Sequence, residues 1–308
     1  MTTALISHSD CLNHVTPEGH PERVARLEHL LHALAPLDLL RLAAPPASDA
    51  DIGRIHPQRY IERIAAAEPA EGETQLDGDT WMSPGSMQAA RRAAGSVIRA
   101  VDAVSSREVS NAFCGVRPPG HHAERETPMG FCIFGNAALA AQYALDHHGL
   151  SRVAIVDFDV HHGNGTQDLI WDEDRVLLIS SHQSPLWPGT GDATETGGHG
   201  NVLNIPLPPG SDGAEMRAAY EAQVFPRLNA FAPDLLILSA GFDAHTDDPL
   251  AQLDWNTEDF RWLTRALCQI AAKHCRGRLV SVLEGGYDLA ALAASGRAHV
   301  EELIEAGK

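Results

Sequence analysis

Short apolar stretches alternate along the chain with longer stretches in which apolar residues recur at helical spacing. The short stretches are typical of strands that are buried on both faces of a parallel sheet. The longer ones predict amphipathic helices. We expect strands at residues 3–7, 112–116, 153–156, 176–180, 202–207, 235–239 and 279–283, and helices at residues 21–34, 57–67, 83–104, 137–148, 165–172, 214–231 and 257–274.

This alternation predicts the fold class. Strands separated by helix-length segments indicate an α/β fold with a mainly parallel, doubly wound sheet flanked by helices. The chain has 308 residues and no linker-like stretch, so we expect a single catalytic domain over residues 1–308. Residues 43–79 are richer in Pro, Asp and Glu, and apart from the short helix they are expected to form peripheral loops.

Side chains that can bind a metal ion follow the predicted strand at residues 153–156. Asp159 and His161 lie two positions apart, so in an extended segment both point to the same side. A carboxylate and an imidazole suit a divalent ion such as zinc, and three protein ligands with an open position are typical of catalytic sites. The alternative is a polar turn that caps a helix. So many ionisable groups at a strand end favour the metal site, because buried charge is costly unless it is compensated.

Three more predicted strands end in reactive side chains, namely those that precede His121-His122, residues 243–248 and Tyr287. In a parallel sheet these ends lie along one edge, so we expect an active site at the carboxyl ends of the strands. The alternatives are that the tandem histidines are exposed polar residues and that Tyr287 is a core aromatic. The stiff Pro-Pro-Gly loop before His121 and the glycine pair before Tyr287 favour a function.

Charge and cysteine content narrow the functional classes. The formal net charge of −18 makes nucleic acid an unsuitable partner and favours cationic substrates. The five cysteines show no paired spacing of a thiolate zinc site, and we expect them to be reduced core residues. The first residues resemble neither a signal peptide nor a membrane span, so we expect a cytoplasmic protein without a membrane partner.

The ordered motifs resemble those of histone-deacetylase-like amidohydrolases in the arginase/deacetylase superfamily. The resemblance runs from about His8 to Tyr287. Asn164 and the His-Pro-Glu-Arg motif that begins at His20 resemble the class II branch and its bacterial relatives. The motifs are Pro-Pro-Gly-His-His-Ala from Pro118, Asp-Phe-Asp-Val-His-His-Gly-Asn-Gly from Asp157, Pro-Gly-Thr-Gly-Asp from Pro188, Ser-Ala-Gly-Phe-Asp-Ala-His from Ser239, Asp-Pro-Leu from Asp248 and Leu-Glu-Gly-Gly-Tyr from Leu283.

The resemblance implies two ions. It assigns one catalytic Zn²⁺ to Asp159, His161 and Asp248, with Asp248 preferred over Asp247 because it directly precedes Pro249. It also implies a structural K⁺. The K⁺ ligands would be the backbone of Asp157, Asp159, His161 and Ser181 and the side chains of Asp157 and Ser180.

The resemblance also assigns catalytic roles. His121 and His122 would be the tandem base and acid pair, with Asp157 behind His121. Asn164 would lie behind the second histidine, where class I members have Asp, and a neutral amide raises the basicity of an imidazole less than a carboxylate does. Tyr287 would donate its hydroxyl to the developing oxyanion.

A substrate tunnel is implied as well. Phe131 and Trp187 would form its walls beside Gly130, and Asp79 would hold the substrate backbone at the rim. Arg23 would lie near the acetate exit. Leu250 stands where a polyamine-selective relative has an acidic gatekeeper.

The function expected from the resemblance is that of a zinc-dependent amidohydrolase. It would remove acetyl or other acyl groups from acetyl-lysine peptides or small acetylated amines. The alternative is an acetylpolyamine amidohydrolase. Two other classes are less favoured: a catalytically silent binding module, because every expected group is present, and an arginase-type ureohydrolase, because a two-metal site needs additional Asp residues. A homo-oligomeric state is neither predicted nor excluded.

Overall fold

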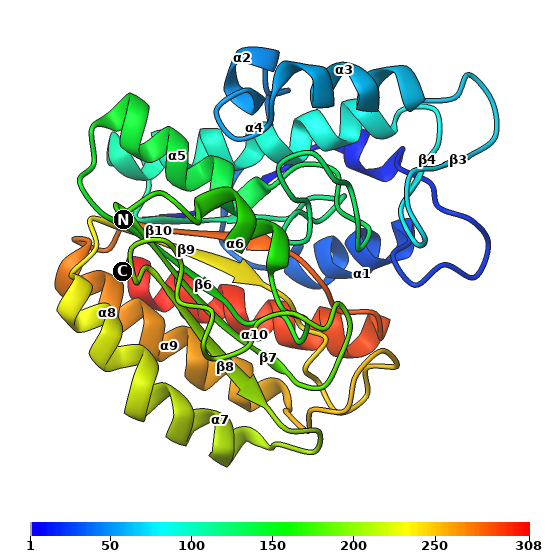
Figure 1. The fold of residues 1–308 in the computed structure, drawn as a ribbon. Coiled ribbons are helices and arrows are strands. Elements are labelled where there is room, and N and C mark those ends of the chain that lie inside the picture. The colour runs from blue at the N-terminus through cyan, green and yellow to red at the C-terminus, as the bar shows by residue number, and fades with distance from the viewer. Residues whose placement is uncertain (1) are drawn as a thin grey trace.

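The structure, a computed structural model, describes residues 2–308. Its centre is an eight-stranded sheet in the order β2-β1-β5-β10-β9-β6-β7-β8, and every neighbouring pair is parallel (Figure 1). The expected parallel α/β fold is therefore confirmed. The strands are β1 Thr3–Ser7, β2 Leu40–Ala43, β5 Asn111–Cys114, β6 Val153–Asp157, β7 Val176–Gln183, β8 Val202–Leu207, β9 Leu235–Ala240 and β10 Leu279–Leu283.

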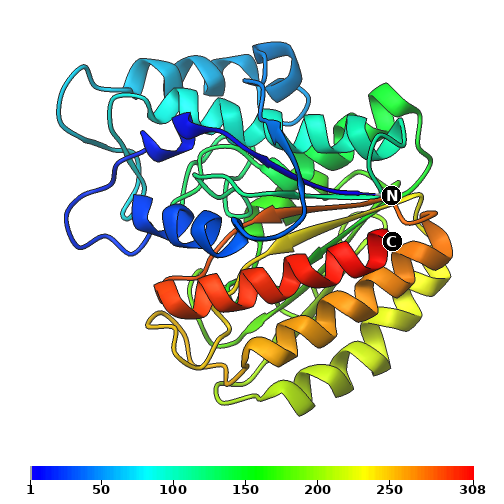
Figure 2. The same cartoon turned by 180° about the vertical axis from the view of Figure 1, so that it is seen from behind.

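Helices cover both faces of the sheet. One face is covered by α4, α5 and α6, with α2 and α3 further out, and the other by α1, α10, α9 and the α7–α8 segment (Figures 1 and 2). Burial on both faces explains why β6 is apolar up to its terminal Asp157 and wholly buried. The helices are α1 Val24–Leu34, α2 Asp49–Ile52, α3 Gln58–Ala67, α4 Ser86–Ser105, α5 Asn136–His148, α6 Asn164–Ile170, α7 Gly213–Ala219, α8 Phe225–Phe231, α9 Thr257–His274 and α10 Leu289–Gly307.

Several elements were not expected from the sequence. β2 is a largely exposed edge strand, so it lacks the continuous apolar pattern of the central strands. α10 begins after Asp288, whose side chain accepts hydrogen bonds from the N–H groups of Ala290 and Ala291. A small antiparallel ribbon of β3 Thr74–Gln75 and β4 Trp81–Met82 lies in the region expected to form loops.

The helix expected at residues 214–231 contains an irregular turn. A π-helical segment, Tyr220–Val224, separates α7 from α8. Pro226 lies just after it and has no N–H to donate to a preceding carbonyl, which explains the departure from α-helical bonding. The turn places the Tyr220 hydroxyl 2.7 Å from Ser181 Oγ on β7.

Apolar side chains gather in a core on both sides of the sheet. All five cysteines are free and buried, as expected for core residues. Within residues 2–308, no helix is both long enough and apolar enough to cross a membrane.

Candidate active site

Four loops that carry candidate chemistry meet at one edge of the sheet. They follow β5, β10, β9 and β6, which are neighbours in the sheet and end at this edge (Figure 1). Hydrogen bonds join the loops: the N–H of Gly285 donates to Asp159 (2.8 Å) and the N–H of Tyr287 donates to Asp248 (2.7 Å). The convergence expected from the sequence is therefore confirmed.

Asp159, His161 and Asp243 form a compact buried cluster. Nδ1 of His161 lies 3.1 Å from Asp159 Oδ1 and 3.2 Å from Asp243 Oδ2. The ligand atoms of the three residues all lie within 4.8 Å of one another. The N–H of Val160 donates to Asp243 Oδ1 (2.9 Å) and helps to orient that carboxylate. The loops after β6 and β9 thus bring two carboxylates and one imidazole together.

Asp248, the expected third ligand, lies outside the group of ligand atoms within 4.8 Å of one another, and its role as a zinc ligand stays a prediction. The Asp248 carboxylate accepts three backbone hydrogen bonds. The N–H of Leu250 donates to Oδ1 (3.0 Å), and those of Tyr287 and Asp288 donate to Oδ2 (2.7 and 3.3 Å). These hydrogen bonds hold the Asp248 carboxylate beside the loop that carries Tyr287.

The charges of the cluster favour a bound cation. Burial raises the pKa of Asp243 to about 7, and the negative charge of Asp159 adds to this effect. Burial opposes protonation of His161, yet its hydrogen bonds to Asp159 and Asp243 raise its pKa to about 10. Two buried carboxylates and an imidazole therefore attract positive charge strongly. This ligand set suits zinc and leaves a coordination position for substrate.

Two glycines create the space around the carboxylates. A Cβ at Gly241 would collide with Asp159, and a Cβ at Gly285 would collide with both Asp243 and Asp159. Gly286 has a φ of +117°, which disfavours any residue with a side chain. The Gly-Gly pair before Tyr287 is thus required by close packing at one position and by backbone conformation at the other.

His122 has a defined tautomer. Its Nδ1 lies 2.8 Å from Asn164 Oδ1, and the Asn164 amide nitrogen donates to Glu124 Oε1 (2.9 Å). Because the amide oxygen can only accept, Nδ1 carries the hydrogen and Nε2 keeps a free lone pair. Burial and the positive charges of His121 and His161 hold the pKa of His122 well below its ordinary value.

His121 lies in the opposite electrostatic environment. Its Nδ1 is 3.0 Å from Asp157 Oδ2, and its Nε2 is 3.7 Å from Asp159 Oδ2. Burial alone would lower its pKa, but the charges of Asp159 and Asp157 raise the pKa well above the ordinary value. The two rings lie 3.8 Å apart between centroids, so a charged and a neutral imidazole stand side by side.

Glu284 supports the histidine loop and was missed in the sequence. Its Oε2 accepts hydrogen bonds from the N–H groups of Gly120 (2.7 Å) and His121 (3.1 Å), and Ser239 donates to Oε1 (2.8 Å). Burial raises its pKa to about 7. Its position at the end of β10, between a buried strand and Gly-Gly-Tyr, is the signal that could have identified it.

Arg23 does not line the pocket that holds His122 and Tyr287, and its place near an acetate exit stays a prediction. The helix expected from Pro21 begins only at Val24, so Arg23 is the extended residue before α1 and its side chain is exposed. Arg26 takes the buried position instead. It donates to the carbonyls of Gly286 (2.5 Å) and Glu284 (2.6 Å).

A fully buried ion cluster lies beneath the two loops. Glu22 accepts from Arg26 Nη1 (2.9 Å) and from Arg117 Nη2 (2.7 Å), and all three side chains are 0 % exposed. The Arg26 guanidinium also lies 4.7 Å from the centroid of the Tyr287 ring. One carboxylate thereby links the segment before His121 to the segment before Tyr287.

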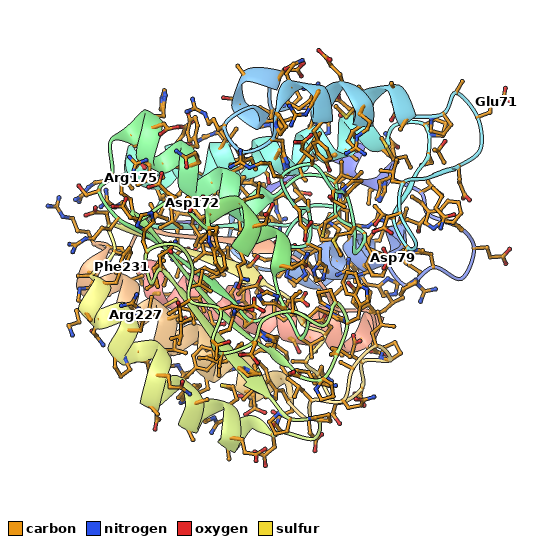
Figure 3. All side chains as sticks on the ribbon, viewed as in Figure 1. Glu71, Asp79, Asp172, Arg175, Arg227 and Phe231 are labelled. Atoms are coloured by element: carbon orange, nitrogen blue, oxygen red, sulfur yellow. The ribbon has the colours of Figure 1, made fainter. Side chains whose placement is uncertain are left out.

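The expected tunnel residues line one pocket of about 180 Å³. Phe131 lies edge-on to Tyr287 at 5.7 Å, and Trp187 lies edge-on to His122 at 4.7 Å. Asp79, labelled in Figure 3, accepts from the N–H of Gly130 (3.1 Å). Leu186 also lines the pocket and was not identified from the sequence. The complete lining is Asp79, His122, Gly130, Phe131, His161, Leu186, Trp187, Leu250 and Tyr287.

The residues expected to hold potassium are partly brought together by strand pairing. Asp157 on β6 is the register partner of Ser180 on β7. Ser180 Oγ lies 3.0 Å from His182 Nδ1, and Ser181 Oγ contacts the Tyr220 hydroxyl. The potassium site stays a prediction.

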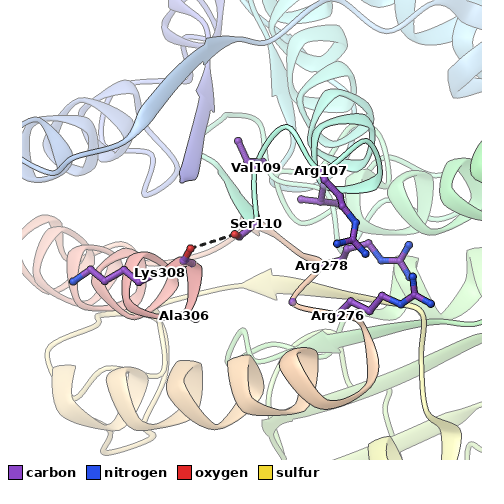
Figure 4. A pocket seen from close by; sticks show the side chains of 10 residues that line it. Arg107, Val109, Ser110, Arg276, Arg278, Ala306 and Lys308 are labelled. Atoms are coloured by element: carbon purple, nitrogen blue, oxygen red, sulfur yellow. Dashed lines mark hydrogen bonds between the residues drawn. The ribbon is translucent and has the colours of Figure 1, made fainter. Parts of the chain in front are cut away.

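A second pocket, of about 200 Å³, lies beside residues that precede β5 and β10, at the opposite edge of the sheet. Arg107, Arg276 and Arg278 gather on one side of it (Figure 4). None of its lining side chains is a carboxylate or an imidazole. It therefore lacks an acid–base pair, and the candidate catalytic groups belong to the pocket lined by His122 and Tyr287.

The fold and the site together define a protein of the histone deacetylase class. The family model described as the histone deacetylase domain matches residues 20–303. The chain therefore belongs to the histone deacetylase family.

Three relatives illustrate the similarity. A histone deacetylase-like amidohydrolase of Pseudomonas aeruginosa is 43% identical, with 92% of this chain and 77% of that protein covered. The human polyamine deacetylase HDAC10 is 37% identical, with 99% of this chain and 48% of that protein covered. The crystal structure of the HDA15 HD domain superposes with a TM-score of 0.94 at 34% identity, covering 99% of this chain and 88% of that one.

Proposed function

We propose that the chain is a zinc-dependent deacetylase whose preferred substrate is acetyl-lysine in a peptide or protein. The observation that carries the proposal is the position of the Asp159–His161–Asp243 cluster. His161 of this cluster lines the same pocket as His122 and Tyr287. A metal ligand set, a general base and a hydroxyl donor therefore border one space, as amide hydrolysis requires.

The residues have separate tasks in this proposal. A zinc ion held by Asp159, His161 and Asp243 would supply Lewis acidity to the acyl carbonyl and to the attacking water. His122 accepts a proton from the water at Nε2 and returns it to the departing amine. Tyr287 donates its hydroxyl to the developing oxyanion. Burial raises the pKa of Tyr287 well above its ordinary value, so the hydroxyl keeps its proton.

The pocket lining suits a lysine side chain. The rings of Phe131, Trp187 and Tyr287 offer apolar surface to the methylene groups. Asp79 is the one carboxylate in the lining and can accept a hydrogen bond from a substrate backbone N–H. Trp187 is 42% exposed, so it lies where the pocket meets solvent.

An acetylated polyamine is the second candidate substrate. The net charge of −18 would attract a polycation, and the human relative named polyamine deacetylase supports this alternative. The pocket wall at Leu250 is apolar, however, and offers no carboxylate to a second ammonium group. We therefore favour a substrate with one acylated amine on an apolar stem.

We also propose a structural potassium ion near Asp157. The backbone oxygens of Asp157, Asp159, His161 and Ser181 would bind it, together with the side chains of Asp157 and Ser180. Oxygen ligands of this kind suit a hard cation. A rise in Tm with K⁺ that Na⁺ does not reproduce would support the potassium site. Identical melting curves in both salts would contradict it.

A turnover panel on the zinc-loaded protein tests the proposal. It contains acetyl-lysine peptides, longer acyl-lysine peptides, acetylputrescine and acetylspermidine. Fastest turnover on acetyl-lysine peptides is the expected result. Strong activity on the acetylpolyamines with weak activity on peptides would overturn the substrate preference. Absence of turnover on every acylated amine would overturn the deacetylase proposal itself.

A further inference from the structure

A second group of metal-capable side chains lies away from the active site. Within residues 2–308, Asp102, His147 and His148 bring one ligand atom each to within 4.8 Å of the others. Asp102 lies near the end of α4, and the histidines end α5. Both helices end next to segments that lead into β5 and β6, at the amino edge of the sheet. The group is thus at the edge opposite the active site.

The geometry of the three side chains is held in place by neighbours. Nε2 of His148 lies 2.8 Å from Asp102 Oδ1, and the Tyr143 hydroxyl donates to the same oxygen (3.0 Å). The His147 ring stacks on the Tyr143 ring at 4.8 Å with an interplanar angle of 13°. Arg54 lies 5.3 Å from the Tyr143 centroid and pairs with Asp146. These contacts already order the side chains, so binding an ion would cost them little further conformational entropy.

The chemistry of this group fits a transition-metal ion. Two imidazoles and one carboxylate suit zinc, nickel or copper, whereas calcium and magnesium prefer oxygen ligands alone. His147 and His148 occupy the last turn of α5, where the helix dipole favours positive charge. The charge of Arg54 is offset by its ion pair with Asp146 (2.9 Å).

We propose that Asp102, His147 and His148 bind a divalent zinc-class ion that links α4 to α5. On binding, His148 would change tautomer: Nε2 gives up its proton and Nδ1 takes one up from solvent, so that the neutral imidazole binds the metal through Nε2 in place of the hydrogen bond to Asp102. α4 packs on β1, β5 and β10, while α5 packs on β6 and β9. The ion would therefore join helices that cover different parts of the sheet, and it would stabilise the fold by binding the native state alone.

Calorimetric titration of the zinc-loaded enzyme with further Zn²⁺ tests this site. We expect one additional equivalent to bind and Tm to rise with zinc concentration. Asp102→Asn and His147→Gln should each weaken this second binding by about tenfold or more and abolish the rise in Tm. Asn keeps an acceptor for Tyr143, and His147 is exposed, so both variants should fold. Turnover of the zinc-loaded variants should equal that of the wild type.

His32→Gln is the matched control, because His32 is an exposed histidine on α1 outside the group. It should bind the second equivalent as the wild type does. The proposal is overturned if no second equivalent binds, or if His147→Gln and Asp102→Asn bind it with wild-type affinity. Loss of binding in His32→Gln would likewise place the ion elsewhere.

Discussion

Asn164 Oδ1 accepts a hydrogen bond from His122 Nδ1 at 2.8 Å, while the nitrogen of the same amide donates to Glu124. The amide therefore cannot be reversed without facing its N–H₂ group toward the histidine. This single contact leaves Nε2 of His122 as the free acceptor toward the pocket. It holds the tautomer without placing a negative charge beside the imidazole.

The first prediction concerns the effect of a negative charge beside His122. In Asn164→Asp, a carboxylate would stabilise the imidazolium form and raise the pKa of His122. The base would then stay protonated up to a higher pH, so the acidic limb of the kcat/KM profile should move to higher pH. The measurement is a pH–rate profile of both zinc-loaded proteins. Coincident acidic limbs would show that Asn164 does not set the basicity of the catalytic group.

The second prediction separates Asp243 from Asp248. Asp243→Ala should lose zinc and activity, because it removes one member of the buried cluster. Asp248→Ala should retain zinc but reduce kcat, because the N–H groups of Tyr287 and Asp288 lose their acceptor. Elemental analysis beside kinetics distinguishes the two. Full zinc occupancy in Asp243→Ala, with loss of zinc in Asp248→Ala, would restore Asp248 as the ligand.

The third prediction concerns the hydroxyl of Tyr287. Tyr287→Phe keeps the ring contacts with Phe131 and Arg26 and removes one donor. Turnover should fall by about a hundredfold or more, the scale of losing one oxyanion-hole donor. Zinc content and Tm should stay near those of the wild type. Near-normal turnover in the zinc-loaded variant would mean that the oxyanion is stabilised without this side chain.

The fourth prediction compares two arginines near the start of α1. Arg26→Ala removes one partner of the buried Glu22 and should lower the free energy of unfolding by about 3–5 kcal/mol. Arg23→Ala is the matched control, because Arg23 is exposed, and its effect should lie within about 0.5 kcal/mol. Urea unfolding of both variants provides the measurement. Equal stability losses would contradict the assignment of Arg26 as the buried member.

The fifth prediction concerns stability at acid pH. His299 is fully buried between Thr264 Oγ1 (2.7 Å) and Ser281 Oγ (2.8 Å), and burial lowers its pKa from 6.5 to about 3. Below pH 6.5 the unfolded chain binds a proton at this histidine that the folded chain does not. The contribution of neutral His299 to the free energy of unfolding is therefore fully present above pH 6.5. It declines as pH falls toward 3, by about 1.4 kcal/mol per pH unit at most.

His299→Gln tests this contribution. The variant should be less stable than the wild type at pH 7, because it alters two buried hydrogen bonds. Its free energy of unfolding should fall less steeply with decreasing pH. The difference in slope should be at most about 1.4 kcal/mol per pH unit, the effect of one proton. Parallel pH dependences of the two proteins would assign the acid sensitivity to other groups.

The alternation of apolar strands and amphipathic helices was sufficient to predict the parallel α/β fold, because strands covered on both faces must be apolar along their whole length. β2 escaped prediction because an exposed edge strand needs no such pattern. The position of chemistry at one edge was also predictable, since parallel strands all end on the same side. His121, His122, Asp159, His161 and Tyr287 were identified in this way.

The tertiary structure decided which residues of the loops face the cluster. Asp243 and Asp248 lie in one loop and are chemically identical, and only the packing of Gly285 and the N–H groups around Tyr287 distinguishes them. Arg23 and Arg26 differ because α1 begins at Val24, a boundary that a periodic pattern does not determine. The sequence by itself thus determined the fold class and the edge that holds the chemistry. The direction of each side chain depends on contacts between segments far apart in the chain, and only the folded structure specifies these.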